Sequence, residues 1–487
     1  MLSEVPELRI RRVNDHDLKS EGDYVLYWMT AFRRTRSNFA LEHARNLALE
    51  LCRPLLILEA LRVGYRWASD RMHRFVIEGM RDNAAACSER SVTYFPYVEL
   101  ERGQGRGLVH ALAANACVVV TDDYPCFFHP RMIKAVSAKL PVRLEAIDSN
   151  CLMPLDYADR TFTVAHSYRR WMQKQLPAHL QEFPESDPLA ADLPQLKNGS
   201  MKEFRQRWPE ADFEALLADG GLKDLPIDHE VQAGAIEGGA VAAEELLSRF
   251  AKSRLATYDE DRNEPDEFGS SELSPHLHFG HISPHEVFAR VMEIENWTPN
   301  RLLKPNGKVN GFWGVSENAE AFLDQLCSWR EIGFNMCWRE PGYARLDSLP
   351  DWTQKTIREH ADDPREYVYT LEQFENSETH DPIWNAAQRQ LVREGRIHNY
   401  MRMLWGKKIL HWTEHPRDAL KIMVELNNKY ALDGRDPNSY SGIFWVLGRY
   451  DRAWGPERPI FGKIRYMTSE NTAKKHKLGK YLQRYAK

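Results

Sequence analysis

The first 150 residues alternate short apolar segments with segments of helical periodicity, and this alternation constrains the fold more than any other feature of the chain. Strands are expected at 24–28, 54–58, 92–97, 117–121 and 142–146. Helices are expected between them, at 38–51, 70–85, 108–116 and 131–139. Apolar strands separated by helices are typical of a parallel sheet covered on both faces. The sequence therefore predicts an α/β N-terminal doubly wound parallel-sheet domain, with any ligand at the carboxyl ends of its strands.

Two polar segments of this region could bind a ligand or form simple turns. Gly103-Gln-Gly105-Arg-Gly107 precedes an expected helix and could cradle a phosphate, but its spacing is not the dinucleotide fingerprint, so a turn is favoured. Asp122-Asp123 directly follows an expected strand, where such folds bind ligands, and could equally be a turn.

The chain of 487 residues is too long for one compact core, and its character changes after the first region. Residues 156–235 contain Pro-rich and acidic pieces typical of an interdomain connection. Helical periodicity then dominates, over 244–256, 284–294, 319–336, 381–395, 399–412 and 417–428. We therefore expect an α/β domain at 1–155, a connection at 156–235 and an all-α C-terminal domain at 236–487.

The net charge of −5 conceals an asymmetry along the chain. Residues 401–487 hold 18 Lys and Arg against 8 Asp and Glu, a net charge of +10, which leaves −15 on the first 400 residues. A basic end on an acidic protein indicates a local site for a polyanion, or else a solvated basic surface.

Composition also bears on location. Apolar runs such as 116–120 are far shorter than the roughly 20 residues of a membrane helix, and the charged first 25 residues contain no apolar signal core. The seven cysteines form no C-x-x-C pair. These features predict a reduced, cytoplasmic setting without membrane attachment.

Three segments concentrate residues that are costly to bury. The segment 257–280 places adjacent hydroxyls before Leu-Ser-Pro, which could bind phosphate at a helix start or could simply cap the helix. The segment 381–412 holds Trp405 and Trp412, which on a helix lie on one face roughly 10.5 Å apart and are more often core than an electron path. The segment 426–454 combines loop-forming polar residues with tryptophans and arginines, the pairing that binds unstacked bases.

Taken together, these segments resemble the class II cyclobutane pyrimidine dimer photolyases of the photolyase/cryptochrome superfamily. The resemblance covers nearly the whole chain and is tightest in 381–470. It rests there on WNAAQ, YMRM-x-W-x-KKIL-x-W, LDGRDPN-x-Y and DRAW-x-PERP-x-FGK-x-RYM. The resemblance implies an N-terminal antenna domain and a helical domain that buries FAD, with a deazaflavin-type antenna chromophore possible.

The resemblance also implies which residues would hold FAD. Tyr258 and the segment Ser270, Ser271, Leu273, Ser274 would bind the diphosphate and ribityl part. Arg402 and Asp433 would flank the isoalloxazine, with Arg402 favouring the anionic reduced ring, and Asn427 would face its N5. Asp436 and Asn438 would add further contacts.

The implied reaction is light-driven repair of cyclobutane pyrimidine dimers in DNA, by electron transfer from reduced anionic FAD to a flipped-out dimer. Three tryptophans would conduct electrons to the flavin from the surface: Trp384, Trp405 and Trp412. Trp329 and Trp445 would cradle the dimer, with Met403 beneath it. Further substrate contacts are expected from Asn399, Arg452 and Trp454. The expected partner is damaged DNA, duplex or single-stranded, with no obligate protein partner and a monomeric enzyme.

One residue departs from the family pattern. Gln325, four before Trp329, stands where the family usually has a glutamate that touches the dimer, and a glutamine cannot ionise or supply a proton. Asp324 could compensate, although it points to another face of a helix. The departure keeps a second function open, a cryptochrome-like FAD blue-light photoreceptor with little or no repair activity. The presence of Trp329, Trp445 and Met403 and the basic C-terminal stretch favour repair, as does the short segment after the RYM motif, since a sensor often carries a long tail there.

Overall fold

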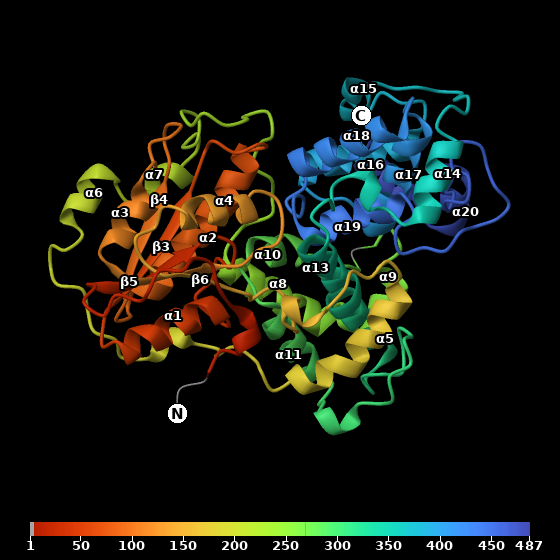
Figure 1. Cartoon of the computed structure of the whole chain (residues 1–487). Coiled ribbons are helices and arrows are strands. Elements are labelled where there is room, and N and C mark those ends of the chain that lie inside the picture. The colour runs from red at the N-terminus through yellow and green to blue at the C-terminus, as the bar shows by residue number, and fades with distance from the viewer. Residues whose placement is uncertain (1–3, 268) are drawn as a thin grey trace. The chain divides into compact units, whose positions relative to one another are not determined.

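The computed structural model describes residues 4–267 and 269–487, which divide into two compact units (Figure 1). Unit 1 comprises the chain up to Tyr157, Ala178–Ser248 and Leu273–Arg290. Unit 2 comprises Ala158–Pro177, Arg249–Glu272 and Val291–Lys487. Residues 178–235, which the sequence assigns to a connection, are thus part of unit 1.

Unit 1 contains a six-stranded sheet in the order β1-β6-β5-β2-β3-β4. Its strands are β1 (Ile10–Arg12), β2 (Tyr24–Met29), β3 (Leu55–Leu61), β4 (Thr93–Val98), β5 (Ala116–Asp122) and β6 (Leu144–Ile147). All pairs are parallel except β1 with β6, in which Ile10 lies opposite Ile147. The predicted α/β fold class is confirmed, while the edge strand β1 was not expected from the sequence.

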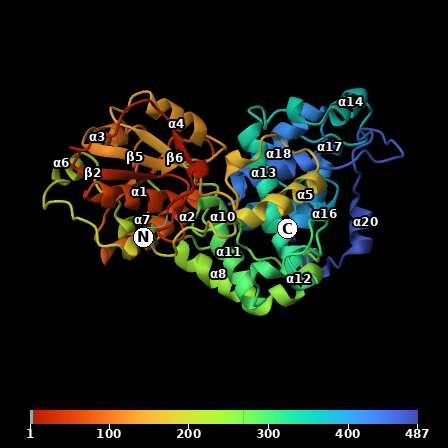
Figure 2. The same ribbon diagram turned by 60° about the horizontal axis from the view of Figure 1, so that its bottom comes forward.

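The sheet is covered on both faces, as the continuous apolar strands predict. Its helices are α1 (Phe39–Glu50), α2 (Asp70–Ser88), α3 (Leu108–Ala114) and α4 (His129–Ser137). Figure 2 shows α3 and α4 on one side of the sheet and α1 on the other. Every residue of β2 is buried, because side chains of alternating orientation meet a helix layer on either face.

The two polar segments of unit 1 serve the fold. The amides of Gly103 and Gly105 donate to Glu99 Oε1 at 2.9 and 3.2 Å, so a carboxylate already occupies this loop, in agreement with the turn interpretation. Asp122 accepts three backbone N–H groups from Thr30–Phe32, and Asp123 is bound by both Nε and Nη2 of Arg11.

Unit 2 is helical, and no strand follows β6 within the described residues. Its helices are α5 (Ala165–Gln175), α9 (Tyr258–Asp261), α12 (Glu317–Leu323), α13 (Arg330–Arg339), α14 (Asp351–Glu359), α15 (Leu371–Glu375), α16 (Pro382–Glu394), α17 (Asn399–His411), α18 (Pro416–Tyr430), α19 (Pro437–Val446), α20 (Ser469–Lys475) and α21 (Gly479–Arg484). The chain also forms α6 (Lys202–Arg207), α7 (Phe213–Leu217), α8 (Ala240–Ser253), α10 (Ser274–Phe279) and α11 (Pro284–Ile294). Across the described ranges, no helix is both long and apolar enough to cross a bilayer.

Local sequence signals fix the ends of the helices that carry the site. Asp381 caps α16 by accepting from the amides of Ile383 and Trp384, Pro382 occupies its first position, and Gly395 ends it with a φ of 69°. Asp436 and Pro437 start α19 in the same way. Between α12 and α13, residues Asp324–Trp329 form a π-helical segment within an otherwise continuous helix. Such segments are frequent at functional sites because they re-aim side chains.

Candidate active site

A cluster of charged and amide side chains forms where α17, α18 and α19 pack together. Arg402 Nη2 donates to both carboxylate oxygens of Asp433, at 2.9 and 3.1 Å. Asn427, buried on α18, donates to Ser439 Oγ at 2.6 Å. The structure therefore brings Arg402, Asn427 and Asp433 to neighbouring positions, and Asn438 lies half-buried in the first turn of α19.

Asp436 shares this cluster and has an unusual electrostatic environment. Its carboxylate accepts from the amide of Ser439 at 2.6 Å, yet burial, and then the nearby charge of Asp433, raise its pKa to about 7. The guanidinium groups of Arg330 and Arg402 act in the opposite direction. Two carboxylates beside two guanidinium groups make a site whose charge responds to whatever binds there. Arg330 was missed by the sequence reasoning, although it directly follows Trp329.

The raised pKa of Asp436 predicts a pH-dependent stability. Because the folded-state pKa lies above that of an unfolded aspartate, the folded state binds the extra proton, and stability falls as pH rises from about 4 to about 7. Asp436→Asn retains the helix cap but removes the titration. Relative to the wild type, this variant should gain about 3 kcal/mol of stability between pH 5 and pH 8, because about two pH units below the folded-state pKa contribute about 1.4 kcal/mol each. Urea unfolding of the two proteins at both pH values measures this, and an unchanged difference would contradict the assignment.

The predicted phosphate-binding segment lies beside two arginines. Arg254 Nη1 donates to Ser270 O at 3.1 Å and to Glu272 Oε2 at 2.7 Å, and Arg396 pairs with the same carboxylate. Glu272 holds a φ of 61°, a left-handed conformation that a glutamate rarely adopts. Gly269 permits the close return of this segment, because a Cβ there would lie 2.4 Å from the carbonyl carbon of Asp261.

The residues of this segment that the resemblance assigns to FAD differ in exposure and belong to different units. Ser270 is exposed and Ser271 is half-buried in unit 2, whereas Leu273 is buried and Ser274 exposed, and both belong to unit 1. The sequence reasoning missed Arg254 and Arg396, because they lie more than 140 residues apart and only the fold pairs both with Glu272.

Tyr258 is buried on α9, next to this segment. Its ring packs edge-on against Phe250 and Phe322, at centroid distances of 5.7 and 5.3 Å. Burial raises the pKa of Tyr258 to about 12, so the phenol stays protonated and can donate a hydrogen bond.

Trp329 and Trp445 stack directly on each other. Their ring centroids lie 4.4 Å apart with an interplanar angle of 19°, and both side chains are partly exposed. This spacing leaves no room for a base between the two rings, so together they present one aromatic surface. Gln325 lies partly exposed on the same π-helical segment as Trp329, and Met403 is half-buried on α17.

Asp324, the residue that could compensate for Gln325, is held in an ion pair. Arg169 binds it through Nε at 2.5 Å and Nη2 at 3.0 Å, and both side chains are buried. This ion pair anchors α5 to the π-helical segment and commits Asp324 to the fold.

The three tryptophans of the expected electron chain are all buried. Trp384 Nε1 donates to Trp405 O at 3.0 Å, and the rings of Trp384 and Trp412 lie 6.2 Å apart. Trp405 Nε1 donates to Gln388 Oε1 at 2.8 Å. Trp384 is therefore the central member, in contact with both others.

The remaining predicted substrate residues are exposed. The ring of Trp454 is 38% exposed, with the guanidinium carbons of Arg452 and Arg465 at 5.1 and 5.4 Å from its centroid. Asn399, the first residue of α17, is also exposed. An aromatic face between two cations is suited to a base and its phosphate.

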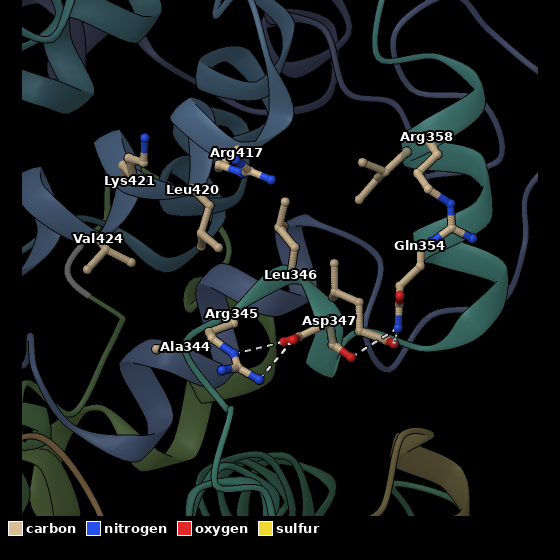
Figure 3. Close-up of a pocket in the computed structure, with 12 residues that line it drawn as sticks. Ala344, Arg345, Leu346, Asp347, Gln354, Arg358, Arg417, Leu420, Lys421 and Val424 are labelled. Carbon is tan, nitrogen blue, oxygen red and sulfur yellow. Dashed lines mark hydrogen bonds and ion pairs between the residues drawn. The ribbon is translucent and has the colours of Figure 1, made fainter.

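A cavity of about 570 Å³ opens elsewhere in unit 2, between α14, α18 and the loop before α14 (Figure 3). Arg358, Arg417 and Lys421 lie around it, and Arg345 is turned onto Asp347, with Nη2 2.8 Å from Oδ2. None of the site residues expected from the sequence lines this cavity. No sequence pattern predicts this cavity, because its walls come from distant segments without a shared motif.

Several curated proteins are similar in sequence to nearly the whole chain. No family model matches the chain. A deoxyribodipyrimidine photo-lyase of Methanothermobacter thermautotrophicus is 32% identical over 477 residues, covering 98% of this chain and 97% of that protein. The photo-lyase of Oryza sativa subsp. japonica is 34% identical, over 95% of this chain and 87% of its own. That of Potorous tridactylus is 31% identical, over 97% and 83%.

A solved structure supports the fold. A bacterial class III photolyase from Agrobacterium tumefaciens matches with a TM-score of 0.68, at 17% identity, over 95% of this chain and 86% of its own. The sequence identity to three photo-lyases exceeds 30% over 83–97% of their lengths. This chain therefore belongs to the deoxyribodipyrimidine photo-lyase family, within the photolyase/cryptochrome superfamily.

Proposed function

We propose that the protein is a class II enzyme that uses light and a reduced, anionic FAD to split cyclobutane pyrimidine dimers in DNA. The observation that carries this proposal is the stacked, partly exposed pair of Trp329 and Trp445 in a chain that is more than 30% identical to three photo-lyases. The class II assignment rests on the motifs between residues 381 and 470.

The donors of the site fit the two ends of a flavin nucleotide. Arg254 and Arg396 supply guanidinium groups beside Ser270 and Ser271, which suits phosphate oxygens. Arg402, Asp433 and Asn427 supply a cation, a carboxylate and an amide, which suit the polar edge of a heterocycle. The bound FAD would supply the electron that opens the cyclobutane ring and would recover it afterwards.

The protein would contribute binding, charge and orientation. The guanidinium of Arg402 would stabilise negative charge beside it, while Asp433 holds that guanidinium in place through two hydrogen bonds. Asn427 would present an amide, which can donate or accept, so it would suit a partner that changes its charge. Burial of the cluster strengthens each of these interactions.

The lesion would lie against the surface of the Trp329–Trp445 pair, since the rings leave no gap between them. A dimer is already poorly stacked in the duplex, which lowers the cost of flipping it out. Trp454 with Arg452 would hold the neighbouring strand, and Gln325 could still hydrogen-bond to the lesion through its amide.

Gln325 is the observation that favours the second candidate, a cryptochrome-like photoreceptor. A photoreceptor would have no need to prefer damaged DNA. Dark binding to oligonucleotides with and without one thymine dimer therefore separates the two functions. A repair enzyme should bind the damaged strand more tightly, and equal affinities would favour the photoreceptor.

Trp454→Ala is expected to weaken binding to both oligonucleotides in that assay. The loss should be about 1–3 kcal/mol, the typical contribution of one base–aromatic stack. Tyr157→Ala, which removes an exposed aromatic side chain of unit 1, serves as the control and should not change the affinity. An unchanged affinity in Trp454→Ala would remove this residue from the DNA-binding surface.

A further inference from the structure

The expected electron chain does not reach the surface at its last tryptophan. Trp412 is only 2% exposed, so an external reductant cannot reach its indole directly. Two aromatic side chains cover it: His380, with its ring centroid 4.9 Å away, and Tyr369, at 5.8 Å. The backbone N–H of Tyr369 also donates to Trp412 O at 2.9 Å, which fixes this contact.

Tyr369 and His380 are hydrogen-bonded in a direction that suits proton transfer. Tyr369 Oη lies 2.7 Å from His380 Nδ1, and the backbone N–H of His380 donates to the same Oη at 3.1 Å. Because the phenolic oxygen already accepts from that amide, its own hydrogen is available to Nδ1. Oxidation of a tyrosine requires an acceptor for the phenolic proton, and this imidazole is in position to be one.

The charge next to Trp412 favours moving an electron hole outward. Lys408 Nζ lies 5.0 Å from the centroid of the Trp412 ring. A cation over an indole stabilises the neutral ring and repels a radical cation on it. A hole on Trp412 would therefore pass readily to a neighbour that can lose a proton and stay neutral.

A second tyrosine lies nearby but is not in contact with Trp412. Tyr367 stacks on His380 with a centroid distance of 3.9 Å and is 39% exposed. Tyr369 contacts Trp412 directly, whereas no ring contact between Tyr367 and Trp412 is found among the described residues. Tyr369 is thus the first phenol on the way out.

We propose that Tyr369 is the terminal electron donor of the tryptophan chain and that His380 accepts its proton. One electron passes from Tyr369 to the oxidised Trp412, and the phenolic proton moves to His380 Nδ1. The products are neutral Trp412, a neutral tyrosyl radical and a protonated His380. A soluble thiol then returns one electron to the radical, and His380 returns the proton. This inference rests on the proposed function, because light absorbed by a bound flavin would be what oxidises Trp412.

The test is time-resolved electron paramagnetic resonance on the full-length, flavin-loaded protein after a blue flash. The wild type should show a tyrosyl radical that is lost in Tyr369→Phe and kept in the matched control Tyr367→Phe. His380→Gln should slow formation of the radical, and added imidazole should restore it. The formation rate should also fall in deuterated solvent, which a purely structural role of His380 would not cause.

The outcomes separate this inference from the proposed function. Tryptophanyl radicals alone in the wild type, or a tyrosyl radical that survives in Tyr369→Phe, would overturn the relay. Chemically reduced Tyr369→Phe should repair dimers as well as the chemically reduced wild type. If both reduced proteins fail to repair while the tyrosyl radical forms, the repair proposal fails and the relay stands.

Discussion

Arg402→Ala is expected to leave the protein largely without flavin. The substitution removes the guanidinium that bridges both oxygens of Asp433 and leaves the carboxylates of Asp433 and Asp436 with one cation fewer. Loss of a charged hydrogen-bond donor from a mostly buried site costs about 1.5–3 kcal/mol of binding free energy. Flavin affinity should therefore fall by roughly 10- to 100-fold. The ratio of flavin to protein absorbance after gel filtration measures this loss.

Two matched variants sharpen that experiment. Arg402→Lys keeps the charge but not the planar guanidinium and should retain part of the flavin. Arg417→Ala removes an arginine from α18 at the cavity of Figure 3, and should retain all of it. Full flavin content in Arg402→Ala would show that the Arg402–Asp433 pair does not hold the cofactor.

Trp384→Phe is expected to abolish most light-driven reduction of the flavin. Trp384 is the central member of the chain, bonded to Trp405 O and in ring contact with Trp412. Phenylalanine keeps the aromatic packing but is much harder to oxidise. A loss of photoreduction rate on the order of 100-fold, equivalent to about 2.7 kcal/mol of barrier, is expected. Absorbance changes of the flavin under continuous blue light with a thiol present measure the rate.

Trp313→Phe is the matched control, because Trp313 is an equally buried tryptophan of unit 2 that packs against Trp297 and Phe312. It should photoreduce at the wild-type rate. After chemical reduction, Trp384→Phe should still repair dimers, since its role ends once the flavin is reduced. Normal photoreduction in Trp384→Phe would mean that electrons arrive by another route.

Local patterns predicted much of the fold. Apolar segments of strand length identified β2 to β6, because a strand buried on both faces needs no alternation of polarity. Helical periodicity over 381–395 identified α16, whose ends the structure places at Asp381 with Pro382 and at Gly395. The edge strand β1 escaped notice, since its three residues include two arginines and its partner β6 lies more than 130 residues away.

The candidate site was also hard to predict, because its residues come together from distant parts of the chain. Arg254 and Arg396 meet at Glu272, and Arg169 meets Asp324, through ion pairs between distant parts of the chain. Such pairs leave no periodic signal in the sequence. The π-helical segment that carries Gln325 and Trp329 was predicted only as part of a regular helix. Likewise, no sequence pattern singles out Tyr369 and His380, because their proposed role depends on their contact with Trp412 in the fold.

The central claim is tested most directly by illuminating the chemically reduced protein with an oligonucleotide that carries one defined thymine dimer. Separation of repaired from damaged strands by chromatography, in matched light and dark samples, gives the extent of repair. Dimers are expected to disappear under blue light only. If no dimer is lost while the flavin remains bound and reduced, and the oxidised protein photoreduces normally in a separate sample, the protein is not a repair enzyme, and the photoreceptor function would take its place.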